Sequence, residues 1–154
     1  MLINKKIFFF IFFTALYISE TAVAEISKDK DSIQISKIWD KGEHNAFTDL
    51  IRFKNRFYCS FREGASHVGS KGKNGKVRIL TSKDGKKWES IALLEVDGVD
   101  LRDPKLSVTP GQKIMVIMAG ATFNENVIEE LYPLVSFSGT SGTSFSTPEK
   151  SIID

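Results

Sequence analysis

The stretch SKDGKKW at residues 82–88 decides the predicted fold. One run of strand-forming residues ends at Ser82, and another begins at Trp88. The Asp84 carboxylate can accept N–H bonds from the turn, and Gly85 can adopt a positive φ. The Trp88 ring can cover the turn and bury a large apolar area. These seven residues therefore predict a tight β-hairpin held by an acidic turn.

A degenerate copy of this pattern lies at residues 138–145 (SGTSGTSF). Thr140 stands at the acidic position, and Phe145 follows Trp88 by 57 residues. The alternative is that residues 136–147 are a Ser/Gly/Thr-rich linker that resembles the turn by composition alone.

The beginnings of the two units also match. The segment Phe47-Thr48-Asp49 opens one hairpin, and Leu101-Arg102-Asp103 opens the next, with the two acidic residues 54 positions apart. Self-similarity at a period above 50 residues is typical of β-propellers. Each unit therefore predicts one four-stranded antiparallel blade.

The predicted fold class is all-β, a partial β-propeller with blades at 47–94 and 101–154. Asn124–Glu130 is the one segment with the character of a helical turn, and the 33–39 run closes the ring or precedes the first blade. Period-two alternation or β-branched and aromatic enrichment predicts eight strands: Ile33–Trp39, Phe47–Phe53, Arg56–Arg62, Lys76–Ser82, Trp88–Leu94, Lys105–Val108, Lys113–Met118 and Leu134–Phe137. Two blades leave apolar faces without neighbours, which indicates the N-terminal part of a longer propeller or a truncated product.

Residues 1–24 have the pattern of a secretory signal peptide. Lys5 and Lys6 precede the apolar run 7–18, and Ala22-Val23-Ala24 supplies a cleavage site. The apolar run is shorter than the roughly 20 residues of a spanning helix. The alternative is an uncleaved membrane anchor. We expect a mature chain of residues 25–154 that is secreted or periplasmic and has no membrane contact after cleavage.

Composition excludes several classes of protein. The net charge of +2 over 154 residues argues against a nucleic-acid partner. The single cysteine, Cys59, excludes an intrachain disulfide framework. Two scattered histidines do not make a standard zinc site, and neither a nucleophile elbow nor a phosphate-binding loop is present in the sequence. We therefore expect no cofactor and no metal.

Four segments together resemble the opening blades of the sialidase-like β-propeller family, which carries Asp-box (BNR) repeats. They are HNAFTDLIRF (44–53), FYCSFREG (57–64), TSKDGKKW (81–88) and DLRDPKLS (100–107). The resemblance implies that the partial β-propeller belongs to a six-bladed ring. It also implies a secreted glycoside hydrolase of the exo-α-sialidase type, or a fragment of one, acting on glycans. The 82–88 turn would then be structural rather than catalytic.

The resemblance also assigns roles to residues. Sialidases bind the substrate carboxylate with the arginine of an Arg-Ile-Pro motif, and Arg102-Asp103-Pro104 has that spacing with Asp103 in place of isoleucine. In the first unit Thr48 stands where this arginine would be. The family's catalytic tyrosine, its glutamate partner and further arginines belong to later blades, so this chain alone is expected to be inactive.

The candidate site residues follow from their chemistry. An arginine fork can bind a carboxylate, and glycoside hydrolysis needs a proton-donating carboxyl group. The candidate catalytic residues are Asp103, Arg102, Arg62 and Glu63, and the candidate substrate-binding residues are His44, Asp49, His67 and Asp100. The alternative is that the arginines form structural ion pairs with these carboxylates and that the histidines are ordinary loop residues.

Three functional hypotheses remain open from the sequence. The first is a sialidase-like glycosidase with a glycan substrate. The second is a non-catalytic propeller that binds a glycan or a protein. The third is a truncated product without independent activity. The sequence gives no oligomeric state.

Overall fold

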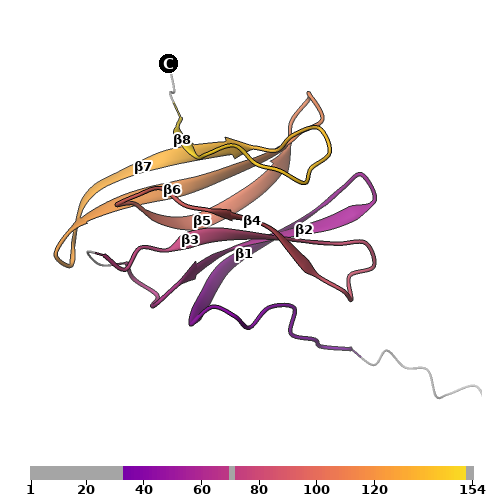
Figure 1. The fold of residues 1–154 in the computed structure, drawn as a ribbon, viewed down its shortest axis with the longest axis horizontal. Helices are drawn as coiled ribbons and strands as arrows, with labels where there is room; N and C mark the ends of the chain where they lie inside the picture. The colour runs from indigo at the N-terminus through magenta and orange to yellow at the C-terminus, as the bar shows by residue number, and fades with distance from the viewer. Residues whose placement is uncertain (1–32, 70–71, 152–154) are drawn as a thin grey trace, which may run out of the picture. The chain divides into compact units, whose positions relative to one another are not determined.

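A computed structural model describes residues 33–69 and 72–151, so the predicted signal peptide at 1–24 lies outside the described residues. The described chain is all-β and contains two four-stranded antiparallel sheets with strand orders β1-β2-β3-β4 and β5-β6-β7-β8 (Figure 1). All strands lie in the second of the chain's two units, Ser36–Asp154. They are β1 His44–Phe53, β2 Arg56–Gly64, β3 Lys76–Ser82, β4 Glu89–Leu94, β5 Asp100–Val108, β6 Ile114–Asn124, β7 Val127–Phe137 and β8 Glu149–Lys150.

Across residues 33–69 and 72–151, we find no helix with the length and apolar character needed to cross a membrane.

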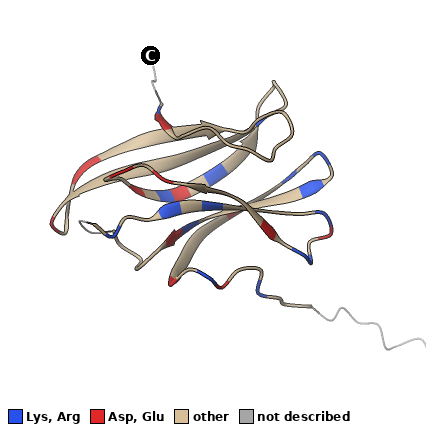
Figure 2. Ribbon diagram, viewed as in Figure 1, with Lys and Arg blue, Asp and Glu red and all other residues tan. Residues whose placement is uncertain are grey.

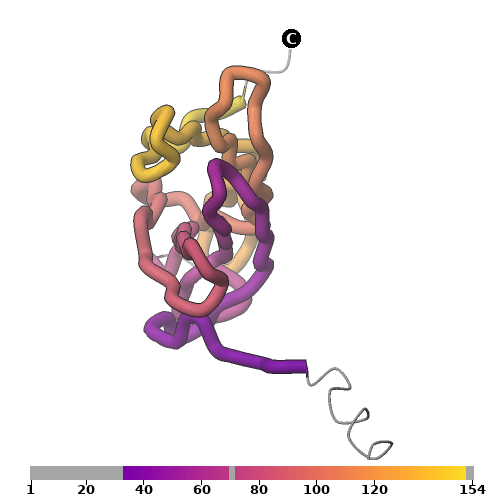
Figure 3. The backbone as a smooth tube through the Cα atoms, turned by 90° about the vertical axis from the view of Figure 1, so that its right-hand side faces the viewer, coloured from indigo at the N-terminus to yellow at the C-terminus, as the bar shows by residue number. Residues whose placement is uncertain are grey.

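Short connections make each sheet an up-and-down meander. Lys54 and Asn55 alone join β1 to β2, and both have positive φ (46° and 61°), as a type I′ turn requires. Figure 3 follows the chain from the first sheet, drawn in indigo and magenta, into the second, drawn in orange and yellow. Within each sheet, consecutive strands are therefore hydrogen-bonded neighbours, as in a propeller blade.

The first strand of each sheet carries a β-bulge at the same place. In β1 the register shifts between Ala46 and Asp49, and in β5 it shifts between Arg102 and Lys105. Each bulge places a non-glycine residue at positive φ: Phe47 at 60° and Asp103 at 51°. The repeat in β1 and β5 is therefore 56 residues. The sequence-based match of Asp49 with Asp103 is wrong by two positions, and Ala46 rather than Thr48 occupies the place of Arg102.

One apolar core lies between the two sheets. It includes Tyr58 and Ile79 from the first sheet and Val116 and Leu134 from the second, all at most 3% exposed. Burying a side chain of this size stabilises the fold by about 1.5–3 kcal/mol. The Leu101 N–H donates to the Gly75 carbonyl at 2.9 Å, which adds a backbone link between the sheets.

The strand register shows that the second sheet repeats the first and packs beside it in the same orientation, so equivalent residues can be compared. Tyr58 and Ser60, which face the second sheet and are fully buried, correspond at an offset of 57 to Met115 and Ile117. Ile117 is instead 40% exposed, because no described residue covers that face. The sheets therefore have the arrangement of two consecutive propeller blades, as the sequence predicts. The number of blades in a complete ring stays a prediction.

Two sequence predictions about elements are wrong. Residues 33–39 form no strand; Ile38 and Trp39 pack instead on Cys59, Phe61 and Leu80 on the other face of the first sheet. Asn124–Glu130 is not a helical turn but the hairpin between β6 and β7.

Candidate functional site

The sequence-predicted residues gather at one end of the two sheets. We call this end the rim: it is the end at which β1, β3, β5 and β7 begin and the β2–β3 loop and β4–β5 connection lie. Acidic and basic segments alternate along β5 in Figure 2. Seven of the candidates lie at the rim: His44, Arg62, Glu63, His67, Asp100, Arg102 and Asp103. The eighth, Asp49, lies farther along β1.

A buried ion pair joins the sheets at the rim. Arg62 Nη2 donates to Asp100 Oδ1 at 2.6 Å, and both side chains are fully buried. Arg62 Nη1 also donates to the Ser66 carbonyl at 2.6 Å, and the Gly75 N–H donates to the same Asp100 oxygen at 2.5 Å. The charges are thus compensated by each other and by backbone, which makes their burial tolerable. For Arg62, this ion pair is the structural alternative that the sequence left open.

Glycines make room for this pair. A Cβ on Gly69 would lie 2.6 Å from Asp100 Cγ, and a Cβ on Gly64 would lie 2.8 Å from Arg62 Nη1. A Cβ on Gly75 would also meet the Arg62 guanidinium. Gly64, Gly69 and Gly75 therefore have a packing reason.

Arg102 and Asp103 lie beside the pair in the bulge of β5. Arg102 Nε is 3.4 Å from Asp100 Oδ2, and its side chain remains 16% exposed. Asp103 is exposed and borders a shallow depression with Ile117, Leu131 and Tyr132, on the face of the second sheet that no described residue covers. Pro104, which is fully buried, anchors the bulge. A bulge beside a cleft is a common device for re-aiming a side chain.

Glu63 belongs to a different cluster. Its carboxylate accepts two bonds from Arg78, at 2.7 and 3.0 Å, and one from Trp39 Nε1 at 2.9 Å. The hydrogen bonds from Arg78 hold the pKa of Glu63 below its usual value. Arg78 also stacks on the Trp39 ring at 4.8 Å. The structure therefore places Glu63 on the face of the first sheet that Trp39 covers, not beside Arg62 and Asp100.

The two histidines contact one another. The His44 and His67 rings are 5.5 Å apart at their centroids, and Phe47 lies 5.2 Å from His67. His67 directly follows Ser66, whose carbonyl binds Arg62. The aromatic cluster thus flanks the buried pair on the β1 side.

Asp49 has a structural contact. Its Oδ2 accepts the Leu106 N–H at 2.7 Å, which ties β1 to β5. Burial and, to a lesser extent, the negative charge of Asp49 raise the pKa of the Cys59 thiol to about 11.

The 82–88 turn lies at the end opposite the rim. Asp84 Oδ1 accepts the Lys86 and Lys87 N–H groups, each at 2.9 Å, and Trp88 Nε1 donates to the Gly85 carbonyl at 3.0 Å. The backbone bonds from Lys87 and Lys86 lower the pKa of Asp84 to about 2. Gly85 has φ 72°, and Gly142 has φ 75° in the second turn. The structural role predicted for this turn agrees with these contacts.

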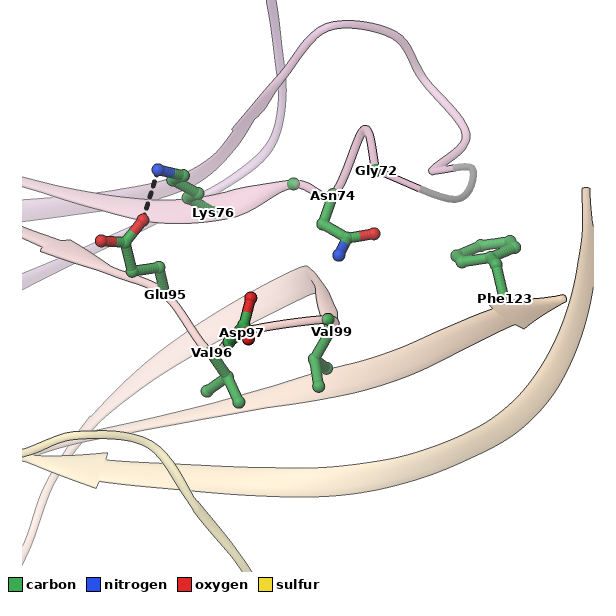
Figure 4. A pocket seen from close by; sticks show the side chains of 10 residues that line it. Gly72, Asn74, Lys76, Glu95, Val96, Asp97, Val99 and Phe123 are labelled. Atoms are coloured by element: carbon green, nitrogen blue, oxygen red, sulfur yellow. Dashed lines mark ion pairs between the residues drawn. The ribbon is translucent and has the colours of Figure 1, made fainter. Parts of the chain in front are cut away.

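A second cavity at the rim is formed by residues that the sequence reasoning did not select. It has a volume of about 690 Å³ and is lined by residues of three segments, including Asn74, Asp97 and Phe123 (Figure 4). An Asp-Gly pair such as Asp97-Gly98 is a turn signal that could have marked part of it, but isolated asparagine and phenylalanine residues carry no motif.

Residues 33–69 and 72–151 contain no group of three or more His, Cys, Asp or Glu side chains able to hold a metal ion.

Comparisons with known proteins give similarity to solved structures only. No family model matches the chain, and no curated protein matches it. A candidate glycosidase from Bacteroides thetaiotaomicron is 13% identical over 66% of this chain and 31% of that chain, with a TM-score of 0.46. A candidate glycoside hydrolase from Parabacteroides distasonis is 15% identical over 66% and 31%, with a TM-score of 0.46. A glycosyl hydrolase from Bacteroides ovatus is 16% identical over 67% and 30%, with a TM-score of 0.44. The chain spans about a third of the length of each.

Proposed function

We propose that this chain is part of a secreted, sialidase-like glycoside hydrolase built on an Asp-box β-propeller. In this proposal the Arg102 guanidinium binds an acidic group of the glycan. The Asp103 carboxyl group transfers a proton to the glycosidic oxygen. The glycan is the partner, and nucleic acid is not.

The observation that supports this most is the bulge of β5. It holds Arg102 and the exposed Asp103 as consecutive residues at the rim, with Asp103 in a backbone conformation that costs about 1–3 kcal/mol. Asp100 Oδ2 approaches Arg102 at Nε, 3.4 Å away, and the Arg102 side chain keeps 16% of its surface exposed. A planar fork beside a proton donor suits a carboxylate-bearing sugar.

The buried pair favours a second candidate, a glycan-binding propeller without catalysis. Arg62 and Asp100 bind each other and have no exposed surface, so neither can contact a substrate in this arrangement. Two of the eight candidates are then structural, and fewer groups remain for catalysis.

Sugar release from sialyllactose and from fluorogenic neutral glycosides tests the proposal. Because this chain alone is expected to be inactive, the assay uses a version of the protein that includes the later blades. There we expect release by the wild type, a loss of at least 100-fold in Asp103→Asn, and weaker substrate binding in Arg102→Ala. Lys105→Ala, an exposed residue of the same strand, is the matched control and should not change release. Absence of release from every glycan, together with unchanged glycan binding by Arg102→Ala, would overturn the proposal. Unchanged release in Asp103→Asn would overturn the role of that carboxyl group. Turnover that disappears in Asp103→Asn would exclude the non-catalytic candidate.

A further inference from the structure

The 690 Å³ cavity lies at the rim, between segments that are distant in sequence. The chain before β3 supplies Asn74, and β3 itself begins with Lys76. The β4–β5 connection supplies Asp97, and the end of β6 supplies Phe123. Figure 4 shows the Asn74 amide, the Asp97 carboxylate and the Phe123 ring around one space. Its volume falls within the roughly 300–1,000 Å³ typical of small-molecule sites.

The lining combines an apolar surface with a few polar groups. Val96, Val99 and Phe123 supply the apolar part, and Phe123 is only partly buried. Gly72 and Gly98 have positive φ, and nothing lies within 4 Å of where a Cβ would stand on either. Bare backbone therefore borders the cavity there, so a ligand can approach the main chain closely.

The charges of the lining disfavour an anion. Lys76 is engaged in an ion pair with Glu95, as the dashed line in Figure 4 marks. Asp97 has no cation among the residues that line the cavity once Lys76 is paired. A carboxylate ligand would meet one uncompensated like charge, Asp97, beside an ion pair whose two charges offset each other, which costs binding energy.

We propose that this cavity binds a neutral pyranoside, as an accessory glycan site separate from Arg102 and Asp103. The Phe123 ring packs on the apolar C–H face of the sugar. The Asn74 amide and the Asp97 carboxylate bind its hydroxyl groups, with the bond to the carboxylate being the stronger of the two.

The accessory site adjoins the buried ion pair without sharing its side chains. Gly75 lines the cavity and donates its N–H to Asp100. The inference does not depend on hydrolysis, because none of the residues proposed for proton transfer lines this cavity.

NMR titration of the ¹⁵N-labelled protein tests the site. The probes are methyl α-mannopyranoside, methyl β-galactopyranoside, methyl β-glucopyranoside and, as the anionic counterpart, N-acetylneuraminic acid. We expect at least one neutral glycoside to shift the Asn74 side-chain and Gly98 amide signals, saturating in the millimolar range. N-acetylneuraminic acid should bind there at least 10-fold more weakly.

Variants of the lining residues test whether the glycoside binds in this cavity. Asn74→Ala and Phe123→Ala should each weaken binding at least 5-fold, while Asn124→Ala, on the same hairpin but outside the lining, should leave it unchanged. If Phe123→Ala does not fold, Asn74→Ala carries the test. The inference is overturned if no neutral glycoside shifts these signals, if the anionic sugar binds there equally well, or if Asn74→Ala binds like the wild type. Shifts confined to Arg102 and Asp103 would favour the proposed function and still overturn this site.

Discussion

Replacing Asp100 by asparagine leaves the buried Arg62 guanidinium without its compensating charge. The carboxylate lies 2.6 Å from Arg62 Nη2 and 3.4 Å from Arg102 Nε, so its loss also leaves two cations facing each other. Breaking a buried ion pair by removing one partner costs about 3–5 kcal/mol. For about 120 ordered residues, 1 kcal/mol corresponds to about 4 °C in Tm, so we expect a decrease of about 12–20 °C.

Thermal unfolding followed by circular dichroism, with reversibility checked by rescanning, measures this decrease. The double variant Arg62→Met with Asp100→Asn should recover at least half of the loss, because no unpaired charge is then buried. Glu89→Ala is the matched control for an exposed ion pair, since Glu89 is 67% exposed and contacts Arg56; we expect about 0–1 kcal/mol. An Asp100→Asn protein that melts within 3 °C of the wild type would refute the reasoning, as would a double variant no more stable than the single one.

Three further predictions concern the turns and the thiol. Because the folded pKa of Asp84 is lowered to about 2 from a model-compound value of 3.8, its stabilising effect is present above about pH 4 and is lost as the pH falls through 2. The Tm difference between wild type and Asp84→Ala should therefore be largest at neutral pH and shrink toward pH 2; a difference independent of pH would contradict this. Burial raises the pKa of Cys59 to about 11, so at pH 8 about one thiol in a thousand is ionised, and labelling by Ellman's reagent should be slow until the protein unfolds. Complete labelling within seconds in native buffer would show that the thiol is accessible. In Gly142→Ala, a Cβ would lie 2.6 Å from Tyr58 Oη in a backbone with φ 75°, so we expect a loss of about 2 kcal/mol or more in urea unfolding. A loss below 0.5 kcal/mol would mean that the second turn does not pack on the first sheet.

The strands of the first sheet were predicted to within three residues at each end, including the edge strand β4. The predicted range of Lys76–Ser82 agrees with β3, whose neighbours are β2 and β4. Such strands have alternating or continuously apolar patterns because at least one face is buried along their whole length. All-β architecture could therefore be predicted from local pattern alone.

The strand ends could not be predicted from the same signal. β7 begins at Val127, seven residues before the predicted start, and its first residues are exposed. Glu129 and Glu130 there have no apolar alternation, because the hairpin of β6 and β7 extends where side chains face solvent. Ile38 and Trp39 show the converse error. Their apolar side chains predicted a strand, but these residues cover Phe61 and Leu80 without forming strand hydrogen bonds to the sheet.

The sequence identified most of the charged residues at the rim, but it did not predict which of them contact one another. Asp100 and Arg62 were identified, but their complete burial depends on Gly69 and Gly75, which approach from a loop. Such a tertiary fit has no period and no motif. Glu63 was placed beside Arg62 by adjacency in sequence, whereas successive side chains on a strand point to opposite faces.

The central claim is that residues 44–94 and 100–150 are two repeats of one blade, packed with a shared core. Nuclear Overhauser effects between the sheets test this most directly. We expect contacts from the Leu101 amide to the Gly75 α-protons and from the Gly142 α-protons to the Tyr58 ring, at intensities comparable to cross-strand contacts such as Leu50 to Cys59 within the first sheet. Strong cross-strand contacts within each sheet and none between the sheets would contradict it.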